Sequence, residues 1–309
     1  SDVYKRQGTA INVEVVDAAG SQTTQNEQVK SLIEKGCDVI CVNLVDRTEP
    51  TTITDMAEKN DVPIIFFNRE LVAEDLERWE KLYYVGADAF GSGIIEGELA
   101  AETFQSDPKY DKNGDDICQY VVLEGEAGHQ DAIVRTEYSV NTLVEKGVKA
   151  EKLGYAIANW KRAQAQTKMT TLLEQYGERI ELILANNDDM ALGAIDALKA
   201  SELPKDEWPI IVGIDGTDVG LGAIKNGEMA GTAYNDKEGQ AEAMLKLAFV
   251  LSEKDPDSGL TLEDIPLQDE KYVRMPYYRV TIDNVEEYVE WSKKKPDGVG
   301  TTENTEITE

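Results

Sequence analysis

Short apolar runs rich in β-branched residues alternate along most of this chain with longer stretches of helical period. In those longer stretches apolar residues recur near every 3.6 positions, as at Met190, Leu192 and Ile195. Such repeated strand–helix–strand units predict an α/β protein with doubly wound parallel sheets covered by helices on both faces. The predicted strands are Ile11–Val16, Asp38–Asn43, Val62–Asn68, Leu82–Gly86, Gln119–Leu123, Gly154–Ile157, Ile180–Asn186, Pro209–Asp215 and Met229–Tyr234.

Length and charge limit the kinds of partner. A chain of 309 residues suits two lobes better than one small core. Its 60 acidic and 31 basic residues give a net charge of −29, which repels phosphate backbones and argues against a nucleic-acid partner. The charge is compatible with neutral ligands and with cations as partners.

Polar residues close five of the predicted strands, namely Asn43, Asn68, Asn186–Asp188, Asp215 and Asn235–Asp236. Taken singly, each is well explained as a turn or helix-cap residue. Ligands of open parallel sheets, however, bind beyond the carboxyl ends of the strands. Five polar strand ends together therefore predict a shared polar cleft.

An acidic loop carries oxygen side chains at alternating positions one, three, five and nine, as in the calcium loop of an EF-hand. Its candidate ligands are Asp111, Asn113, Asp115, Ile117 (through its carbonyl) and Gln119. The pattern is incomplete, because Val122 stands where an EF-hand has its last glutamate and Asp116 where it has glycine. A calcium loop and an acidic surface turn both remain open.

Two further candidates lie at strand-to-helix junctions. Asp131 and Arg135 are four residues apart and share one helical face, either as an ordinary ion pair or as part of a site, and His129 just precedes them. Trp160 precedes a predicted helix at 162–173 and is either a core residue or a stacking platform.

Several of these segments together resemble the galactose/glucose-binding proteins of bacterial ABC importers, in the same order and with similar spacing from about Ile11 to about Tyr288. The resemblance implies two α/β lobes of the type I periplasmic binding protein fold, joined by three crossings. The segments are Phe66–Glu70, Tyr83–Gly86, Gly125–Arg135, Leu184–Ala191, Gly213–Asp215 and Gly231–Asp236.

Residue by residue, the resemblance implies a sugar site and a structural Ca²⁺ site. Glu181 would supply the bidentate calcium ligand that the acidic loop lacks. Because Asp116 replaces the usual glycine of the loop, the affinity for calcium stays open. The implied sugar contacts are Asn68, His129, Asp131, Arg135, Trp160, Asn187 and Asp215, with Asn235 near a hinge.

The expected lobes are residues 8–86 with 236–273, and 87–235 with 274–292, followed by a disordered tail at 293–309. Residues 1–7 are interpreted as a non-native leader, because they resemble a translated sequencing adapter. The family's lobes begin with a strand and helix before the segment at 11–36, so we expect a truncated N-terminal lobe and weak or absent sugar binding.

The predicted function is a substrate-binding component without enzymatic activity, a monomer that binds one galactose/glucose-type monosaccharide. An ABC permease and a chemoreceptor are its expected partners. Its expected location is periplasmic or extracellular, free or lipid-anchored. Two alternatives stay open: a glycoside hydrolase that uses Asp131 and Asp215, and a sugar-sensing transcription regulator without its DNA-binding head. Galactose is not ranked above glucose.

Overall fold

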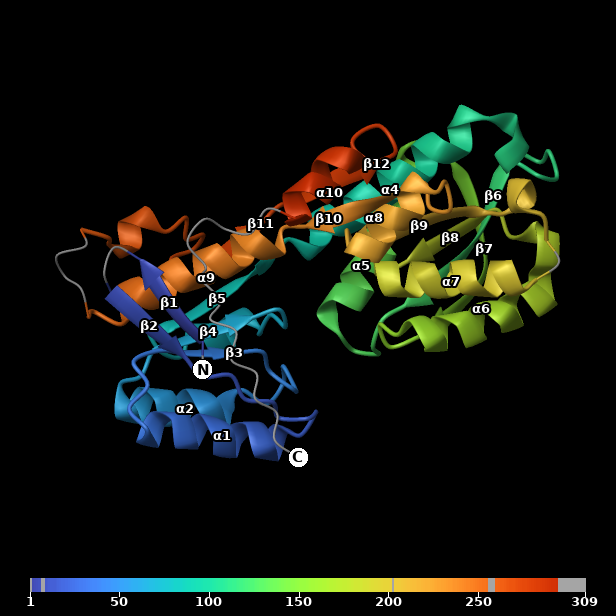
Figure 1. Ribbon diagram of the computed structural model, residues 1–309. Coiled ribbons are helices and arrows are strands. Elements are labelled where there is room, and N and C mark those ends of the chain that lie inside the picture. Colours follow the sequence, from blue (N-terminus) through green and yellow to red (C-terminus); the bar gives the residue numbers. More distant parts are fainter. Residues whose placement is uncertain (1, 7–8, 202, 255–258, 294–309) are drawn as a thin grey trace, which may run out of the picture. The chain divides into compact units, whose positions relative to one another are not determined.

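The computed structural model describes residues 2–6, 9–201, 203–254 and 259–293 (Figure 1). The chain divides into two compact units. Unit 1 comprises residues 1–86, 237–274 and 294–309, and unit 2 comprises residues 87–236 and 275–293. Compared with the expected lobes, the second and third crossings lie one residue later. The expected disordered tail begins at Lys293, which ends a helix, and its remaining residues lie outside the described part of the chain.

Unit 2 is built on a six-stranded sheet with the order β12-β10-β9-β8-β6-β7. The five strands from β6 to β10 run parallel, and β12 pairs antiparallel with β10. The strands are β6 (Ile117–Glu124), β7 (Lys149–Ile157), β8 (Leu182–Ala185), β9 (Ile210–Asp215), β10 (Gly231–Asn235) and β12 (Tyr277–Thr281).

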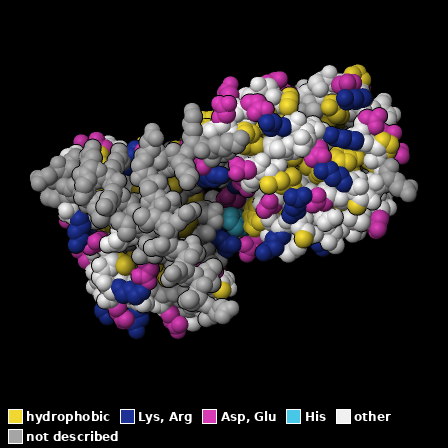
Figure 2. Space-filling model, viewed as in Figure 1, with side chains coloured by type: hydrophobic (Ala, Val, Ile, Leu, Met, Phe, Trp, Pro, Cys, Tyr) yellow, Lys and Arg dark blue, Asp and Glu magenta, His cyan; other side chains and the backbone are white. Residues whose placement is uncertain are grey.

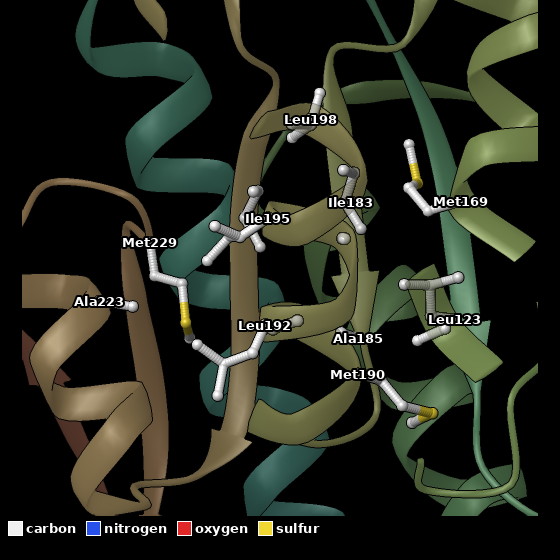
Figure 3. Close-up of a cluster of buried hydrophobic side chains, with 14 of the residues drawn as sticks. Leu123, Met169, Ile183, Ala185, Met190, Leu192, Ile195, Leu198, Ala223 and Met229 are labelled. Carbon is white, nitrogen blue, oxygen red and sulfur yellow. The ribbon is translucent and has the colours of Figure 1, made fainter. Parts of the chain in front are cut away.

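Helices cover both faces of this sheet, as expected for a doubly wound fold (Figure 1). Successive residues of a strand point to opposite faces, so Val121 packs toward one helical layer and Val122 toward the other. Figure 3 shows the first of these cores, in which Leu123 and Ile183 meet the apolar side of α7. The helices are α4 (Ala89–Ser106), α5 (Gln130–Glu145), α6 (Arg162–Tyr176), α7 (Asp188–Ala200), α8 (Asp218–Lys225) and α10 (Val285–Lys293).

The antiparallel β12 is an addition to the predicted parallel sheet. Its segment follows β11 (Tyr272–Met275) directly and is separated from it by Pro276, so no helix intervenes that could return the chain for parallel pairing. The strand–helix alternation therefore fails at this point, and the sequence reasoning did not identify either strand.

Unit 1 contains a four-stranded sheet with the order β11-β5-β4-β3. Its apolar side chains pack with α1 and α2 into one core, in which Ile53 and Phe66 are fully buried. The remaining elements of unit 1 are α1 (Gln22–Glu34), β3 (Ile40–Val42), α2 (Thr51–Asn60), β4 (Ile64–Phe67), α3 (Ala73–Leu76), β5 (Leu82–Ala87) and α9 (Lys237–Leu251).

The first predicted strand does not join this sheet. Instead β2 (Thr9–Val13) pairs antiparallel with β1 (Asp2–Arg6), whose residues fall within the expected leader. Two strands separated by two residues pair at a low cost in loop-closure entropy, which explains why the local partner prevails. Among the described strands, β3 and β11 are therefore the two edge strands of this sheet.

Charges of both signs are scattered over the face of unit 2 that Figure 2 shows. This mixed surface differs from the basic stripe of a nucleic-acid-binding protein. Within the described residues, no helix combines the length and the apolar character needed to cross a membrane.

Candidate functional site

A group of polar side chains lies at the carboxyl ends of β6 and β8, the neighbouring strands at which the chain reverses its direction of winding. Asn186, directly after β8, is fully buried and accepts a hydrogen bond from the backbone N–H of Gly125, directly after β6, at 3.1 Å. Its amide also donates to the hydroxyl of Thr136 on α5 at 3.1 Å. These contacts fix the two loops to each other, where ligands of doubly wound sheets bind.

Arg135 is the centre of this group and is only 5% exposed. Its Nη1 donates to the carbonyl of Asn186 at 2.8 Å and lies 3.7 Å from Asp215 Oδ1. Its Nη2 donates to Tyr277 Oη at 2.7 Å and to Asp131 Oδ2 at 3.3 Å. The guanidinium therefore joins α5, β8, β9 and β12 around one buried positive charge.

Burial and the neighbouring charges shift the pKa values of Asp215 and Tyr277. Burial raises the pKa of Asp215 to about 6, Arg135 opposes that rise, and the negative charge of Asp131 adds to it. Burial also raises the pKa of the Tyr277 phenol, against the opposing charge of Arg135. The side chains of Asp131 and Asp215 remain 20% and 29% exposed, so both carboxylates can accept hydrogen bonds from a ligand.

Trp160 lies beside Arg135, with the guanidinium carbon 5.7 Å from its ring centroid. It has a φ of +62°, a left-handed conformation that is costly for a bulky residue and persists only where neighbouring contacts hold it. The indole occupies the space beside Gly125, where an added Cβ would come within 2.2 Å of the ring. His129 meets the indole edge to face at a centroid distance of 5.1 Å. The ring is only partly buried, as a stacking platform requires.

His129 and Asn187 also cap helices, a role that the sequence analysis considered for Asn187 but not for His129. His129 caps α5, since its Nδ1 accepts from the backbone N–H of Asp131 at 3.1 Å. Asn187 caps α7, since its Oδ1 accepts from the backbone N–H of Met190 at 2.9 Å.

The other two expected sugar contacts are Asn235 in unit 2 and Asn68 in unit 1. Asn235 ends β10 and is opposite Tyr277 in the strand register, so it belongs to the neighbourhood of Arg135. Asn68 lies in unit 1 at the end of β4, is exposed, and has a φ of +62°. Its amide donates to Asn43 Oδ1 at 3.4 Å, and its carbonyl accepts from the hydroxyl of Tyr84 at 3.0 Å.

The sequence reasoning missed Tyr277, which supplies the closest side-chain partner of Arg135. The two residues are 142 positions apart. Tyr277 sits in a segment that has no strand–helix period, so the sequence held no local signal for this contact.

The acidic loop is ordered by its own hydrogen bonds. The carboxylate of Asp111 accepts from the backbone N–H groups of Gly114, Asp115 and Asp116 at 2.8 to 3.1 Å. Asp116 takes the left-handed conformation, with a φ of +60°, in place of the glycine of an EF-hand. The position therefore accepts aspartate, which adopts this conformation more readily than most residues.

Glu181 reaches this loop from the start of β8. Its two carboxylate oxygens accept from the backbone N–H groups of Lys112 at 2.6 Å and Gln119 at 2.9 Å. Burial raises the pKa of Glu181, and the negative charges of Asp111 and Asp115 raise it further. The expected carboxylates thus lie close enough to repel one another, a repulsion that a divalent cation would relieve.

The loop nevertheless does not present a formed metal site. The amides of Asn113 and Gln119 donate to Asp115 Oδ2, both at 3.0 Å, instead of turning their oxygens to a common point. Among the described residues, no three His, Cys, Asp or Glu side chains are arranged to hold a metal ion. Rotation of the two amides is needed before the donor types present could surround calcium.

Residues 3–255 of the chain match the family described as periplasmic binding protein domain. The chain is 38% identical over 277 residues to the D-galactose/methyl-galactoside binding periplasmic protein MglB of Haemophilus influenzae, which covers 88% of this chain and 81% of that protein. It is 30% identical over 250 residues to a putative rhizopine-binding protein of Rhizobium meliloti, covering 81% of this chain and 77% of the relative.

A solved structure with the same fold is an ABC transporter solute binding protein of Bacillus halodurans with bound myo-inositol. It superimposes with a TM-score of 0.73 at 30% identity and covers 89% of this chain and 85% of its own. The match confirms the predicted fold class.

Proposed function

Because this chain belongs to the periplasmic binding protein family, we propose that it is a non-catalytic receptor for a hexose of the galactose/glucose type. The observation that carries the proposal is the group formed by Arg135, Asp131 and Asp215 beside the partly exposed ring of Trp160. A relative with 38% identity is named for binding D-galactose and methyl-galactoside.

The chemistry of this group suits an uncharged sugar. Each hydroxyl both donates and accepts, so the carboxylates of Asp131 and Asp215 accept while Arg135 and the amide of Asn187 donate back. The indole of Trp160 offers a flat apolar face to the C–H groups of a pyranose ring. Asn68, in unit 1, is included in the proposal from the family resemblance alone.

A hydrolytic role is less well supported. A glycosidase needs one protonated and one ionised carboxyl group facing a single glycosidic bond. Arg135 contacts Asp131 and approaches Asp215 as well, and carboxylates beside a shared cation are suited to accept hydrogen bonds from sugar hydroxyls. The names of the matched relatives describe binding proteins.

The proposed setting follows from the family. We place the protein in the periplasm or at the cell exterior, either free or lipid-anchored, where it delivers sugar as a monomer to an ABC permease. A chemoreceptor is a second proposed partner.

We also propose that the acidic loop binds Ca²⁺ for structural stability. The ligands would be Asp111, Asn113, Asp115, the Ile117 carbonyl, Gln119 and Glu181. The carboxylate repulsion at Glu181 supports this assignment, and it requires the two amides to rotate.

Titration calorimetry with D-galactose, D-glucose and sucrose tests the sugar proposal. Because the N-terminal lobe is expected to be truncated, we expect weak binding of at least one hexose, none of the disaccharide, and loss of binding in Asp131→Ala. Incubation with p-nitrophenyl galactosides should release no nitrophenol. Nitrophenol release by the wild type that Asp215→Asn abolishes would instead establish the hydrolase.

A further inference from the structure

Asp188 is a fully buried carboxyl group that the proposed sugar contacts do not include. It is the first residue of α7 and reaches toward the turn that follows β9. Its Oδ2 accepts from the backbone N–H of Thr217 at 2.7 Å and from the hydroxyl of Thr217 at 3.3 Å. Its Oδ1 accepts from the hydroxyl of Thr232 on β10 at 2.7 Å. One carboxylate therefore connects α7, β10 and the turn.

The surrounding backbone leaves room for this carboxyl group and little else. A Cβ added at Gly213 would lie 2.6 Å from Asp188 Oδ1, and one at Gly220 would lie 2.2 Å from Oδ2. The carboxylate thus occupies the space that two ordinary side chains would fill. This close fit indicates a position shaped around the Asp188 carboxylate.

The turn that Asp188 holds is strained, and it carries Asp215. Asp215 has a φ of +117°, which is rare for any residue other than glycine. Gly216 follows with a φ of +70°, and a Cβ there would lie 2.3 Å from the ring of Tyr234. Strained backbone of this kind persists only where neighbouring contacts hold it, and the contact from Asp188 to Thr217 lies two residues away.

We propose that Asp188 is a positioning residue: its hydrogen bonds to Thr217 and Thr232 hold the turn at Asp215–Thr217, so that the Asp215 carboxylate faces Arg135 and the sugar. The role in sugar affinity rests on the proposed function. The proximity of the two carboxyl groups supports it, since Asp215 adds to the rise that burial causes in the pKa of Asp188.

Three substitutions in the full chain test this role. Asp188→Ala removes all three hydrogen bonds. Asp188→Asn keeps the shape and both contacts, because the amide oxygen accepts from Thr217 and the amide nitrogen donates to the Thr232 hydroxyl. Ile195→Ala is the control for stability, because Ile195 lies in the core on the same helix, 1% exposed, and is not among the partners of the turn.

Two measurements are made on each variant. Hydrogen exchange of the Thr217 amide, followed by NMR without sugar, reports the turn itself. Galactose affinity, from titration calorimetry, reports the site. Asp188→Ala should speed Thr217 exchange and weaken galactose binding by about tenfold or more. This is the loss expected when the displaced Asp215 carboxylate no longer accepts one charge-assisted hydrogen bond from the sugar. Asp188→Asn should restore both, and Ile195→Ala should leave the affinity unchanged.

Unchanged Thr217 exchange in Asp188→Ala would overturn the inference, as would an equal loss of affinity in Ile195→Ala. If the wild type binds no hexose while Thr217 exchange still depends on Asp188, the proposed function is refuted. The inference that Asp188 stabilises the turn at Asp215–Thr217 is then still supported. The sugar-free measurement therefore separates the two failures.

Discussion

The phenol oxygen of Tyr277 lies 2.7 Å from Nη2 of Arg135, with both groups buried. The same nitrogen contacts Asp131, so the phenol and the carboxylate together determine where the guanidinium points. Because Tyr277 starts β12 and Arg135 lies on α5, this contact also ties the antiparallel edge strand to the proposed sugar site.

Tyr277→Phe should weaken hexose binding about tenfold while the fold is retained. The substitution removes an acceptor from a buried cation, and an unsatisfied hydrogen bond to a charged group costs roughly 1 to 3 kcal/mol. Tyr155→Phe is the matched control, since Tyr155 is 53% exposed on β7. Calorimetric titration of both variants with galactose gives the comparison, and equal affinities would show that the phenol does not position Arg135.

Gly125→Ala should disturb the stacking surface. The new Cβ would come within 2.2 Å of the Trp160 ring, so the indole has to leave its place beside the backbone. We expect a loss of hexose affinity of about tenfold or more, because stacking area and the contact to Arg135 change together. Gly222→Ala, where an added Cβ meets nothing within 4 Å, should bind like the wild type. A crystal structure of Gly125→Ala with the indole unmoved would contradict this reasoning.

Stability should fall as the pH rises from 5 to 8, in part because of Asp188. Burial raises its pKa from 3.8 to about 7, so between these values the folded protein holds a proton that the unfolded chain has lost. Fewer protons bound by the unfolded state mean that unfolding becomes easier with rising pH. The full contribution is present below pH 4 and is lost by about pH 7.

The comparison with Asp188→Asn isolates this contribution. The variant lacks the titrating group, so its free energy of unfolding should decline by about 2 to 3 kcal/mol less than that of the wild type between pH 5 and 8. Urea unfolding at four pH values measures the difference. Glu174→Gln, an exposed substitution on α6, should keep the wild-type slope. Identical slopes for Asp188→Asn and the wild type would mean that Asp188 titrates as an ordinary carboxyl group.

Removal of calcium should destabilise unit 2 if the acidic loop binds the ion. A ligand at 100 times its dissociation constant stabilises the folded state by about 2.7 kcal/mol, so chelation should lower Tm by several degrees. Glu181→Gln should abolish this response, because it removes a charge from the proposed ligand set. Glu174→Gln, an exposed substitution on α6, should retain it. A wild-type Tm that is the same in calcium and in chelator would refute the assignment.

The sequence by itself determined the architecture of most of the chain. Apolar runs of strand length, separated by helical periods, were sufficient because a buried parallel strand and an amphipathic helix each leave a local pattern. The polar ends of β8 and β9 likewise predicted where Asn187 and Asp215 would lie, since the carboxyl ends of parallel strands share one edge. Where the pattern stops, at β12 and at β1, the sequence predicted no strand, and both strands pair antiparallel in the structure.

Only the tertiary structure decided how these residues act on one another. The contact between Arg135 and Tyr277 spans 142 positions, and the contact from Asp188 to Thr232 spans 44. The left-handed backbone at Trp160 and Asp215 is imposed by packing against the intrinsic preference of both residues. Hydrogen bonds and strain of this kind depend on distances between elements, and a local pattern of residue types carries no information about those distances.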